Sequence, residues 1–457
     1  MKVGIDGYNL ALPRGTGVAT YARTLAHTVA TLGHEIDLIY GLGVSAKTRP
    51  DLRESMFFER LGEGDDGGRS LKPTLRRTAL RAFTSPLSRN MVPIPVSGRV
   101  IGDDLKERLP DFDRLFTLGG LFWTSARYFR RYRRFMTVRV ENPPQIMHWT
   151  YPVPVRLAGA ANIYTIHDLV PLRLPHTSLE DKAYYDALIR ECLRTAAHIV
   201  TVSEASRRDI HELFEIAPQR VTNTYQPIDV PAGTRRGDDF DRRLERLFDL
   251  KPDGYFLYFG AIEPKKNVGR LIEAYLASGV EAPLVIVGAG GWRSDQELKL
   301  LNGAHGEGLK AARRVRLLEY LPRRLLLDLA SGARAVLFPS LYEGFGLPAA
   351  EALALGVPLI TSNSGSLPEI VGEAALMVAP YDVSAMAAAL RRLDGDPALR
   401  AQLAAAGPVQ AGNFSSARYQ QAIGQLYQAV AGFMSAPLSR ANTSPTESVA
   451  PPCKASQ

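Results

Sequence analysis

Two glutamates, Glu343 and Glu351, enclose a glycine-rich segment that follows an apolar stretch at residues 333–340. Pro348 stands where a helix would begin, a position at which its missing amide proton costs little. A helix that starts just after two glycines offers free backbone amides and the positive end of its dipole to an anion. Glu351, one turn further on, is suited to accept hydrogen bonds from ribose hydroxyls, and Glu343 to accept them from a sugar. The segment therefore predicts a nucleotide-sugar site.

A pair of lysines, Lys265 and Lys266, is the second candidate for chemistry. It follows an apolar strand pattern at residues 255–259 and a turn at Gly260. An ammonium group at that place could neutralise the charge that builds on a departing diphosphate, and Lys266 is the first candidate for this role. Taken alone, each motif can also be interpreted as a turn with solvated charges. Their occurrence together favours ligand binding.

Two further glycine turns follow predicted strands. Gly288 ends the apolar run 283–287 and could let the backbone approach a ligand closely, or could serve only a tight turn. The loop of Gly15, Thr16 and Gly17 precedes a predicted helix, and we expect it to reach a phosphate across a cleft. It departs from a dinucleotide-binding fingerprint because a threonine replaces the third glycine and six residues separate strand from glycines.

His167 and Asp168 come directly after an apolar strand pattern at residues 162–166. Open parallel sheets bind ligands at this carboxyl edge, so we interpret His167 as a contact of the donor sugar, with capping of the strand end as the alternative. His148 and Tyr151, on the preceding proline-rich segment, could line an acceptor site or only pack in the core.

Metal ligands are not expected. Three Asp-x-Asp pairs occur, but each lies in a polar, loop-like setting, which is typical of solvated turns. We therefore predict no metal and no other cofactor, and we expect Lys266 and helix dipoles to stabilise the leaving group.

The elements that must position these residues alternate between strand and helix, which predicts parallel, doubly wound sheets. Two such α/β domains, each Rossmann-like, are expected to face each other across a cleft. The predicted strands are residues 3–8, 35–40, 162–166 and 198–202 in the first half, and 255–260, 283–288, 315–320, 335–339 and 358–362 in the second.

The predicted domains follow this division of the chain. We expect residues 1–235 to form an acceptor-binding domain with a basic insertion at about 60–140, and residues 236–413 to form the domain that binds the nucleotide sugar. The hinge is expected within the polar segment 229–254. A last amphipathic helix, 414–434, is expected to cross back to the first domain, and a tail, 435–457, is expected to be disordered.

Size and composition agree with this organisation. The chain has 457 residues, and its 46% hydrophobic content can fill two cores. Cys192 and Cys453 are its two cysteines, so a disulfide framework is not expected and a reducing compartment is. The first residues indicate a strand instead of a signal peptide, and long apolar runs are absent, so we expect a cytoplasmic protein.

The net charge of +8 is concentrated in one segment. Residues 69–139 hold sixteen basic and five acidic side chains, a local net charge of +11. A helical wheel over residues 122–136 places aromatic side chains on one side and arginines on the other, which is typical of a helix lying on an anionic membrane. A surface helix that packs its aromatics on its own domain is the equal alternative. We expect a membrane surface, and no nucleic acid, as the polyanionic partner.

In their order along the chain, these motifs resemble those of the retaining GT-B glycosyltransferases of family four. The resemblance covers nearly the whole chain, from the Gly-Thr-Gly loop through His167-Asp168-Leu169, the segment 260–267 and the turn 288–292 to the paired glutamates. It implies that Gly17 and Lys266 hold the diphosphate, with a larger share for Lys265 and Lys266 because Ala261 replaces an arginine of many members. The other donor contacts it implies are His167, Gly260, Gly288, Leu321, Glu343, Gly344, Phe345, Gly346, Leu347 and Glu351, with Asp168 on the acceptor side.

The resemblance has two departures and a functional implication. Ala261 stands where many members have arginine, and Ser416 where several have an aromatic residue. The implied reaction is hexosyl transfer with retention, with GDP-mannose as donor and a polyprenyl-diphosphate-linked saccharide as acceptor in bacterial polysaccharide assembly. A UDP-sugar donor or a catalytically idle sugar-nucleotide-binding subunit are the alternatives.

Overall fold

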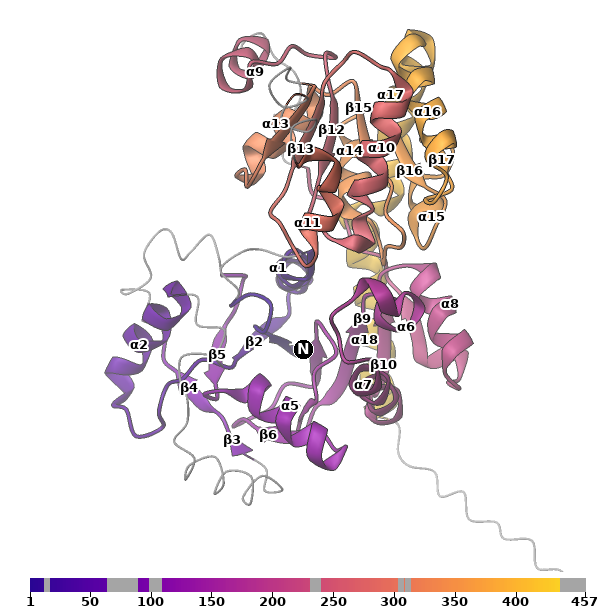
Figure 1. Cartoon of the computed structure of the whole chain (residues 1–457). Coiled ribbons are helices and arrows are strands. Elements are labelled where there is room, and N and C mark those ends of the chain that lie inside the picture. Colours follow the sequence, from indigo (N-terminus) through magenta and orange to yellow (C-terminus); the bar gives the residue numbers. More distant parts are fainter. Residues whose placement is uncertain are drawn as a thin grey trace, which may run out of the picture.

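The computed structural model describes residues 1–11, 17–63, 89–97, 109–230, 240–302, 308 and 314–435. Within them the chain forms two α/β units, an N-terminal one at the bottom of Figure 1 and a C-terminal one above it. The expectations for Gly15, Thr16, the parts of the basic segment at 69–88 and 98–108, and the tail after Ser435 concern residues outside these ranges.

The N-terminal unit is built on an eight-stranded sheet in the order β11-β10-β9-β7-β1-β2-β5-β4. Every neighbouring pair is parallel except β4 with β5. The strands are β1 (Lys2–Asp6), β2 (Glu35–Tyr40), β4 (Val92–Ile94), β5 (Arg114–Thr117), β7 (Ile146–Trp149), β9 (Ala161–Ile166), β10 (His198–Thr201) and β11 (Val221–Asn223).

Helices and a small second sheet complete this unit. The small sheet has the order β3-β6-β8, with β3 (Arg89–Asn90), β6 (Met136–Arg139) and β8 (Val155–Leu157). The helices are α1 (Gly17–Thr31), α2 (Pro50–Gly62), α5 (Leu121–Tyr132), α6 (Val170–Arg173), α7 (Lys182–Thr195) and α8 (Glu204–Leu213).

The C-terminal unit has a six-stranded, fully parallel sheet in the order β14-β13-β12-β15-β16-β17. Its strands are β12 (Phe256–Phe259), β13 (Leu284–Val287), β14 (Val315–Leu318), β15 (Ala335–Phe338), β16 (Leu359–Ser362) and β17 (Leu376–Val378). Its helices are α9 (Phe240–Phe248), α10 (Val268–Ser278), α11 (Ser294–Glu297), α13 (Arg323–Ser331), α14 (Leu347–Ala354), α15 (Leu367–Val371), α16 (Val383–Gly395) and α17 (Pro397–Ala411).

Strands of these sheets are buried on both faces, which explains their continuous apolar sequences. Along β12, Leu257 and Phe259 join one hydrophobic cluster while Phe256 and Tyr258 join the other, because successive side chains of a strand point to opposite faces. The nine strands predicted from sequence are all present, and the doubly wound fold is confirmed.

The last helix, α18 (Ser416–Ser435), lies against the N-terminal unit, where it contacts α1, β7 and β9. Its Tyr427 is fully buried, and the Tyr427 hydroxyl lies 2.8 Å from Nδ1 of His148. Chain segments that are 279 residues apart therefore share one core.

Three sequence predictions need correction. The helix expected over 122–136 ends at Tyr132, because Arg133 adopts a left-handed conformation and Phe135 then enters the core. β4 and β5 belong to the main sheet, so the expected insertion at 60–140 is partly integral to the fold. The expected hinge at 229–254 contains α9, whose Phe240 packs in the core of the C-terminal unit.

Candidate active site

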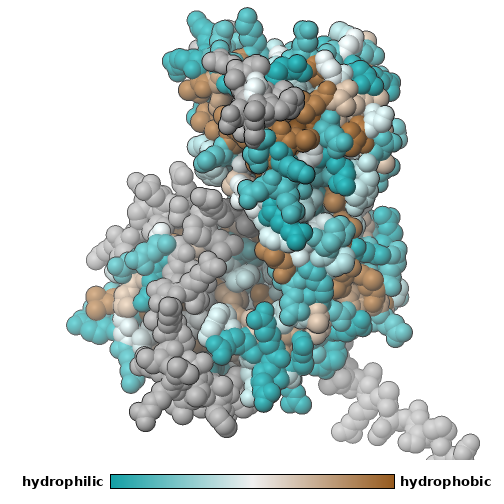
Figure 2. Space-filling model, viewed as in Figure 1, coloured by the Kyte–Doolittle hydropathy of each residue, from teal (hydrophilic) through white to brown (hydrophobic). Residues whose placement is uncertain are grey.

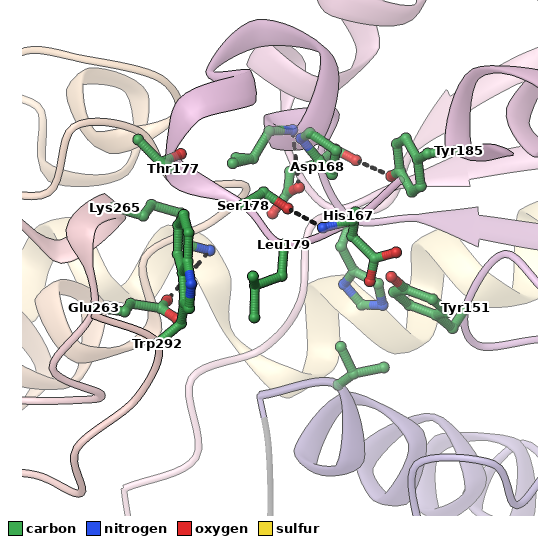
Figure 3. Close-up of a pocket in the computed structure, with 14 residues that line it drawn as sticks. Tyr151, His167, Asp168, Thr177, Ser178, Leu179, Tyr185, Glu263, Lys265 and Trp292 are labelled. Atoms are coloured by element: carbon green, nitrogen blue, oxygen red, sulfur yellow. Dashed lines mark hydrogen bonds and ion pairs between the residues drawn. The ribbon is translucent and has the colours of Figure 1, made fainter. Parts of the chain in front are cut away.

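A cavity of about 290 Å³ lies between the two units. His167, Asp168 and Tyr151 line it from the N-terminal unit, and Lys265 and Trp292 line it from the C-terminal unit, as Figure 3 shows. These side chains follow the carboxyl ends of parallel strands, where such sheets leave room for ligands.

Lys266 and Glu343, which do not line this cavity, form a largely buried ion pair next to Lys265, which does. Lys266 follows β12 and Glu343 follows β15, and these adjacent strands bring Lys266 Nζ within 2.6 Å of Glu343 Oε1. Burial alone would raise the pKa of Glu343, but the ammonium groups of Lys266 and Lys265 outweigh it and lower that pKa. Glu343 is therefore an ionised acceptor that holds Lys266 in place.

Lys265 is the second cation of the site. Burial disfavours its charged form, but the carboxylates of Asp168, Glu343 and Glu263 outweigh burial and raise the pKa of Lys265. Asp168 belongs to the N-terminal unit, so this electrostatic contact crosses the cavity. Lys265 remains an ammonium group at neutral pH and can neutralise an anion there.

His167 is held as a neutral imidazole. Its Nε2 lies 2.9 Å from the backbone carbonyl oxygen of Thr150, which can only accept a hydrogen bond, so Nε2 carries the proton. Burial lowers the pKa of His167 below its usual value, although this hydrogen bond opposes the shift. Nδ1 then bears a lone pair that can accept a hydrogen bond from a sugar hydroxyl.

Glycines bring the two units into contact at the start of α14. A Cβ atom on Gly344 would lie 2.4 Å from the carbonyl oxygen of His167, so only glycine fits there. Gly346 has a φ of 89°, which favours glycine for a second reason. A Cβ on Gly17 would lie 3.6 Å from a methyl carbon of Leu347. The beginnings of α1 and α14 thus face each other.

Gly260 and Gly288 serve the packing of β12 against β13. A Cβ on Gly288 would lie 1.8 Å from the carbonyl oxygen of Gly260. The sequence left two interpretations of Gly288 open, a close approach to a ligand or a tight turn. The close approach of the two strand ends explains this glycine without any ligand. Leu321, in the loop after β14, packs partly against the same core.

Glu351 is buried on α14 and carries an ion pair that the sequence did not indicate. Arg323 Nη1 donates a hydrogen bond to Glu351 Oε1 at 2.7 Å. Burial raises the pKa of Glu351, and the guanidinium group counteracts this shift in part.

His148 does not line the cavity, which corrects the prediction of an acceptor contact. The side chain is fully buried, and its two ring nitrogens lie 2.8 Å from the hydroxyls of Tyr427 and Thr165. The Thr165 hydroxyl lies 3.0 Å from that of Tyr21. His148 therefore belongs to a polar network that fastens α18 to the sheet.

We expect this network to make the protein sensitive to mild acid. Burial lowers the pKa of His148 from 6.5 to about 3. Below about pH 6.5 the imidazole is therefore protonated in the unfolded chain but stays neutral in the folded protein. The free energy of unfolding should then fall by up to about 1.4 kcal/mol per pH unit for this one group. Thermal melting between pH 7.5 and 5 would measure the fall.

The matched variant is His148→Gln, which should melt at a lower temperature at pH 7.5 but with a weaker pH dependence. Burial also lowers the pKa of His167 and His198 and raises the pKa of Asp6 to about 6, and these groups are unchanged in the variant. An equal pH slope in both proteins would show that His148 does not cause it.

Glu263, Trp292 and Leu179 are among the cavity-lining residues that sequence reasoning did not assign to the site. Glu263 lies in the segment 260–267 and Trp292 in the turn 288–292, but the sequence pattern indicates no role for either side chain. Leu179 lies in an irregular loop and is 72% exposed, so no periodic pattern marks it. Among the described residues, His, Cys, Asp and Glu form no group of three that could hold a metal ion.

Two facing α/β units with parallel sheets and a cavity between them define the class of fold, which is GT-B. The same fold is seen in sucrose-phosphate synthase from Thermosynechococcus elongatus, at a TM-score of 0.64 and 19% identity over 95% of this chain and 100% of that one. It is also seen in Anabaena Alr3699/HepE in complex with UDP-glucose, at a TM-score of 0.61 and 14% identity over 94% of this chain and 100% of that one.

The chain belongs to glycosyltransferase family 4. The model of Glycosyltransferase Family 4 matches residues 101–231, and that of Glycosyl transferases group 1 matches residues 242–410. O-antigen chain mannosyltransferase B of Escherichia coli is 35% identical over 268 residues, which cover 58% of this chain and 68% of that protein.

Proposed function

We propose that this glycosyltransferase moves a mannosyl group from GDP-mannose to a lipid-linked saccharide during polysaccharide assembly. The observation that carries the proposal is the Lys266–Glu343 ion pair, whose sequence neighbour Lys265 lines the same cavity as His167 of the opposite unit. A diphosphate needs cations, and a sugar needs hydrogen-bond acceptors such as Glu343 and Nδ1 of His167. The choice of mannose is supported by the similarity to O-antigen chain mannosyltransferase B.

In the proposed reaction, the bond between the anomeric carbon and the diphosphate oxygen breaks while the acceptor oxygen forms a bond on the same face. The acceptor's proton passes to an oxygen of the departing diphosphate, so configuration is retained and no protein base is consumed. Lys265 and Lys266 would stabilise the negative charge on the diphosphate, together with the amides at the start of α14. This route needs no metal ion.

The acceptor would enter beside Tyr151 and Asp168, which line the N-terminal side of the cavity. Tyr185 donates a hydrogen bond to the backbone oxygen of Asp168 at 2.8 Å and so fixes this turn. We propose a polyprenyl-diphosphate-linked saccharide as acceptor, presented at the cytoplasmic face of a membrane.

A transfer assay with GDP-mannose and a polyprenyl-diphosphate-linked oligosaccharide would test this function. Nuclear magnetic resonance of the product would report the anomeric configuration, which should match that of the donor. Thermal shifts with GDP, UDP, ADP and dTDP, each with and without chelator, would identify the nucleotide, because a ligand of the folded state raises its stability. A rise in melting temperature with UDP alone would contradict GDP-mannose as the donor and indicate a UDP-sugar. A rise that disappears when chelator is added would contradict metal independence.

Contact with the membrane is proposed for the exposed face of α5. Arg127, Arg130 and Arg131 are exposed there, as are Trp123 and Tyr132, and hydrophilic side chains gather over α5 in Figure 2. Basic and aromatic side chains together favour the interface of an anionic bilayer. None of the described helices has the length and apolarity needed to cross a membrane.

We therefore expect replacement of Arg127, Arg130 and Arg131 by glutamate to release the protein from vesicles that contain anionic lipid. Each basic residue near such a surface contributes about 1 kcal/mol, so three charge reversals should lower the partition coefficient at least about 100-fold. Co-sedimentation would measure it, with vesicles of zwitterionic lipid alone as the control. Unchanged sedimentation would place the membrane contact elsewhere or remove it.

A further inference from the structure

Arg323 joins the predicted ribose-binding carboxylate to the segment that connects the two units. Nη1 of Arg323 donates to Oε1 of Glu351 at 2.7 Å, and Nη2 donates to the backbone oxygen of Asp229 at 2.8 Å. Asp229 lies between β11, an edge strand of the N-terminal sheet, and α9 of the C-terminal unit. One planar guanidinium group therefore makes both contacts.

Stability alone is a weak reason for this arrangement. The Glu351 side chain is 8% exposed and that of Arg323 is 47% exposed, and an ion pair with a partner so exposed contributes little to folding. Within the described part of the chain, Oε1 of Glu351 receives the guanidinium while Oε2 receives no hydrogen bond. The carboxylate is thus fixed through one oxygen and has the other left to accept.

We propose that Arg323 is a positioning residue for the nucleotide. It holds Glu351 as an oriented carboxylate whose second oxygen accepts hydrogen bonds from the ribose hydroxyls. This inference rests on the proposed binding of a nucleotide sugar with Glu351 at the ribose. Because the same guanidinium also binds the Asp229 carbonyl, the orientation of Glu351 depends on where the connecting segment lies.

The test compares nucleotides that differ only in the ribose hydroxyls. Isothermal titration would measure the affinity of the full chain for GDP and for 2′,3′-dideoxy-GDP, with UDP and its dideoxy analogue in parallel. Hydrogen bonds to a charged acceptor predict that the wild type prefers the ribonucleotide roughly ten-fold or more. Arg323→Ala should lose most of this preference, whereas a purely structural defect would weaken both nucleotides equally.

Arg324→Ala is the matched control, because Arg324 is the next residue of α13, is exposed and carries the same charge. It should keep the wild-type preference. Glu351→Ala distinguishes ribose binding by Glu351 from the positioning of Glu351 by Arg323. If Glu351→Ala loses the preference and Arg323→Ala retains it, the inference is wrong and the ribose assignment stands. If Glu351→Ala also retains it, or if neither nucleotide binds, the assignment of Glu351 fails and the inference fails with it.

Discussion

Replacing Lys266 with alanine should nearly abolish glycosyl transfer. The variant removes an ammonium group that lies 2.6 Å from Glu343, on the residue that follows the cavity-lining Lys265. Loss of one group that stabilises developing charge in a preorganised site typically lowers kcat about 100- to 1000-fold. Initial rates with saturating donor and acceptor would measure the loss, and it should be of the same size with and without chelator.

This variant also leaves the Glu343 carboxylate buried without its partner, which is costly. We therefore expect a lower melting temperature, and the double variant Lys266→Met with Glu343→Gln should recover part of the stability without recovering activity. Lys251→Ala, which removes the same charge from an exposed position, serves as the control. Near wild-type transfer by a folded Lys266→Ala protein would refute the assignment of the leaving-group cation.

Substituting alanine for Gly344 should have the second largest effect, through the contact between the two units. The added Cβ would lie 2.4 Å from the carbonyl oxygen of His167, which is closer than such atoms approach, and in tight contact with Cβ of Asp168 at 3.0 Å. The units must then separate at the point where His167 faces the donor site. A misplacement of about 1 Å can lower the rate about 100-fold.

Nucleotide binding separates this effect from a folding defect. Apart from Gly17, the residues proposed to hold the nucleotide lie in the C-terminal unit, so Gly344→Ala should retain most of its affinity for GDP while kcat falls. Gly395→Ala is the control, because a Cβ at Gly395 would meet no atom within 4 Å. If Gly344→Ala transfers sugar at the wild-type rate, the close contact with His167 is not needed for catalysis.

Several parts of the site could be predicted because their chemistry is local. His167 and Asp168 directly follow β9, and Lys265 and Lys266 lie in the short loop between β12 and α10, so the strand pattern places each pair at the carboxyl edge of its sheet. Strand prediction was accurate for the same reason: strands buried on both faces are continuous runs of apolar residues. The prediction of a helix over 122–136 was wrong at its end, because the helical periodicity of the sequence continues past Arg133 whereas the backbone leaves the helix there and enters β6 (Met136–Arg139).

Partners distant in sequence could not be predicted, because no local pattern records them. Arg323 is one exposed arginine among many until α13 places it beside Glu351 and Asp229. His148 follows a pattern that also suits a ligand contact, and only the docking of α18 buries it against Tyr427. The requirement for glycine at position 344 depends on the N-terminal unit, because the atom that a Cβ would clash with is the carbonyl oxygen of His167.

The sequence by itself determined the two doubly wound units and the residue types at their strand ends, because hydrophobic periodicity and glycine turns act over a few neighbouring residues. The tertiary structure decided which of these residues meet. It places Lys266 in an ion pair with Glu343 and Arg323 in an ion pair with Glu351. It also orients His167, whose Nε2 donates a hydrogen bond to Thr150. Such choices depend on distances across the fold, and those distances are fixed only when the sheets and helices pack together.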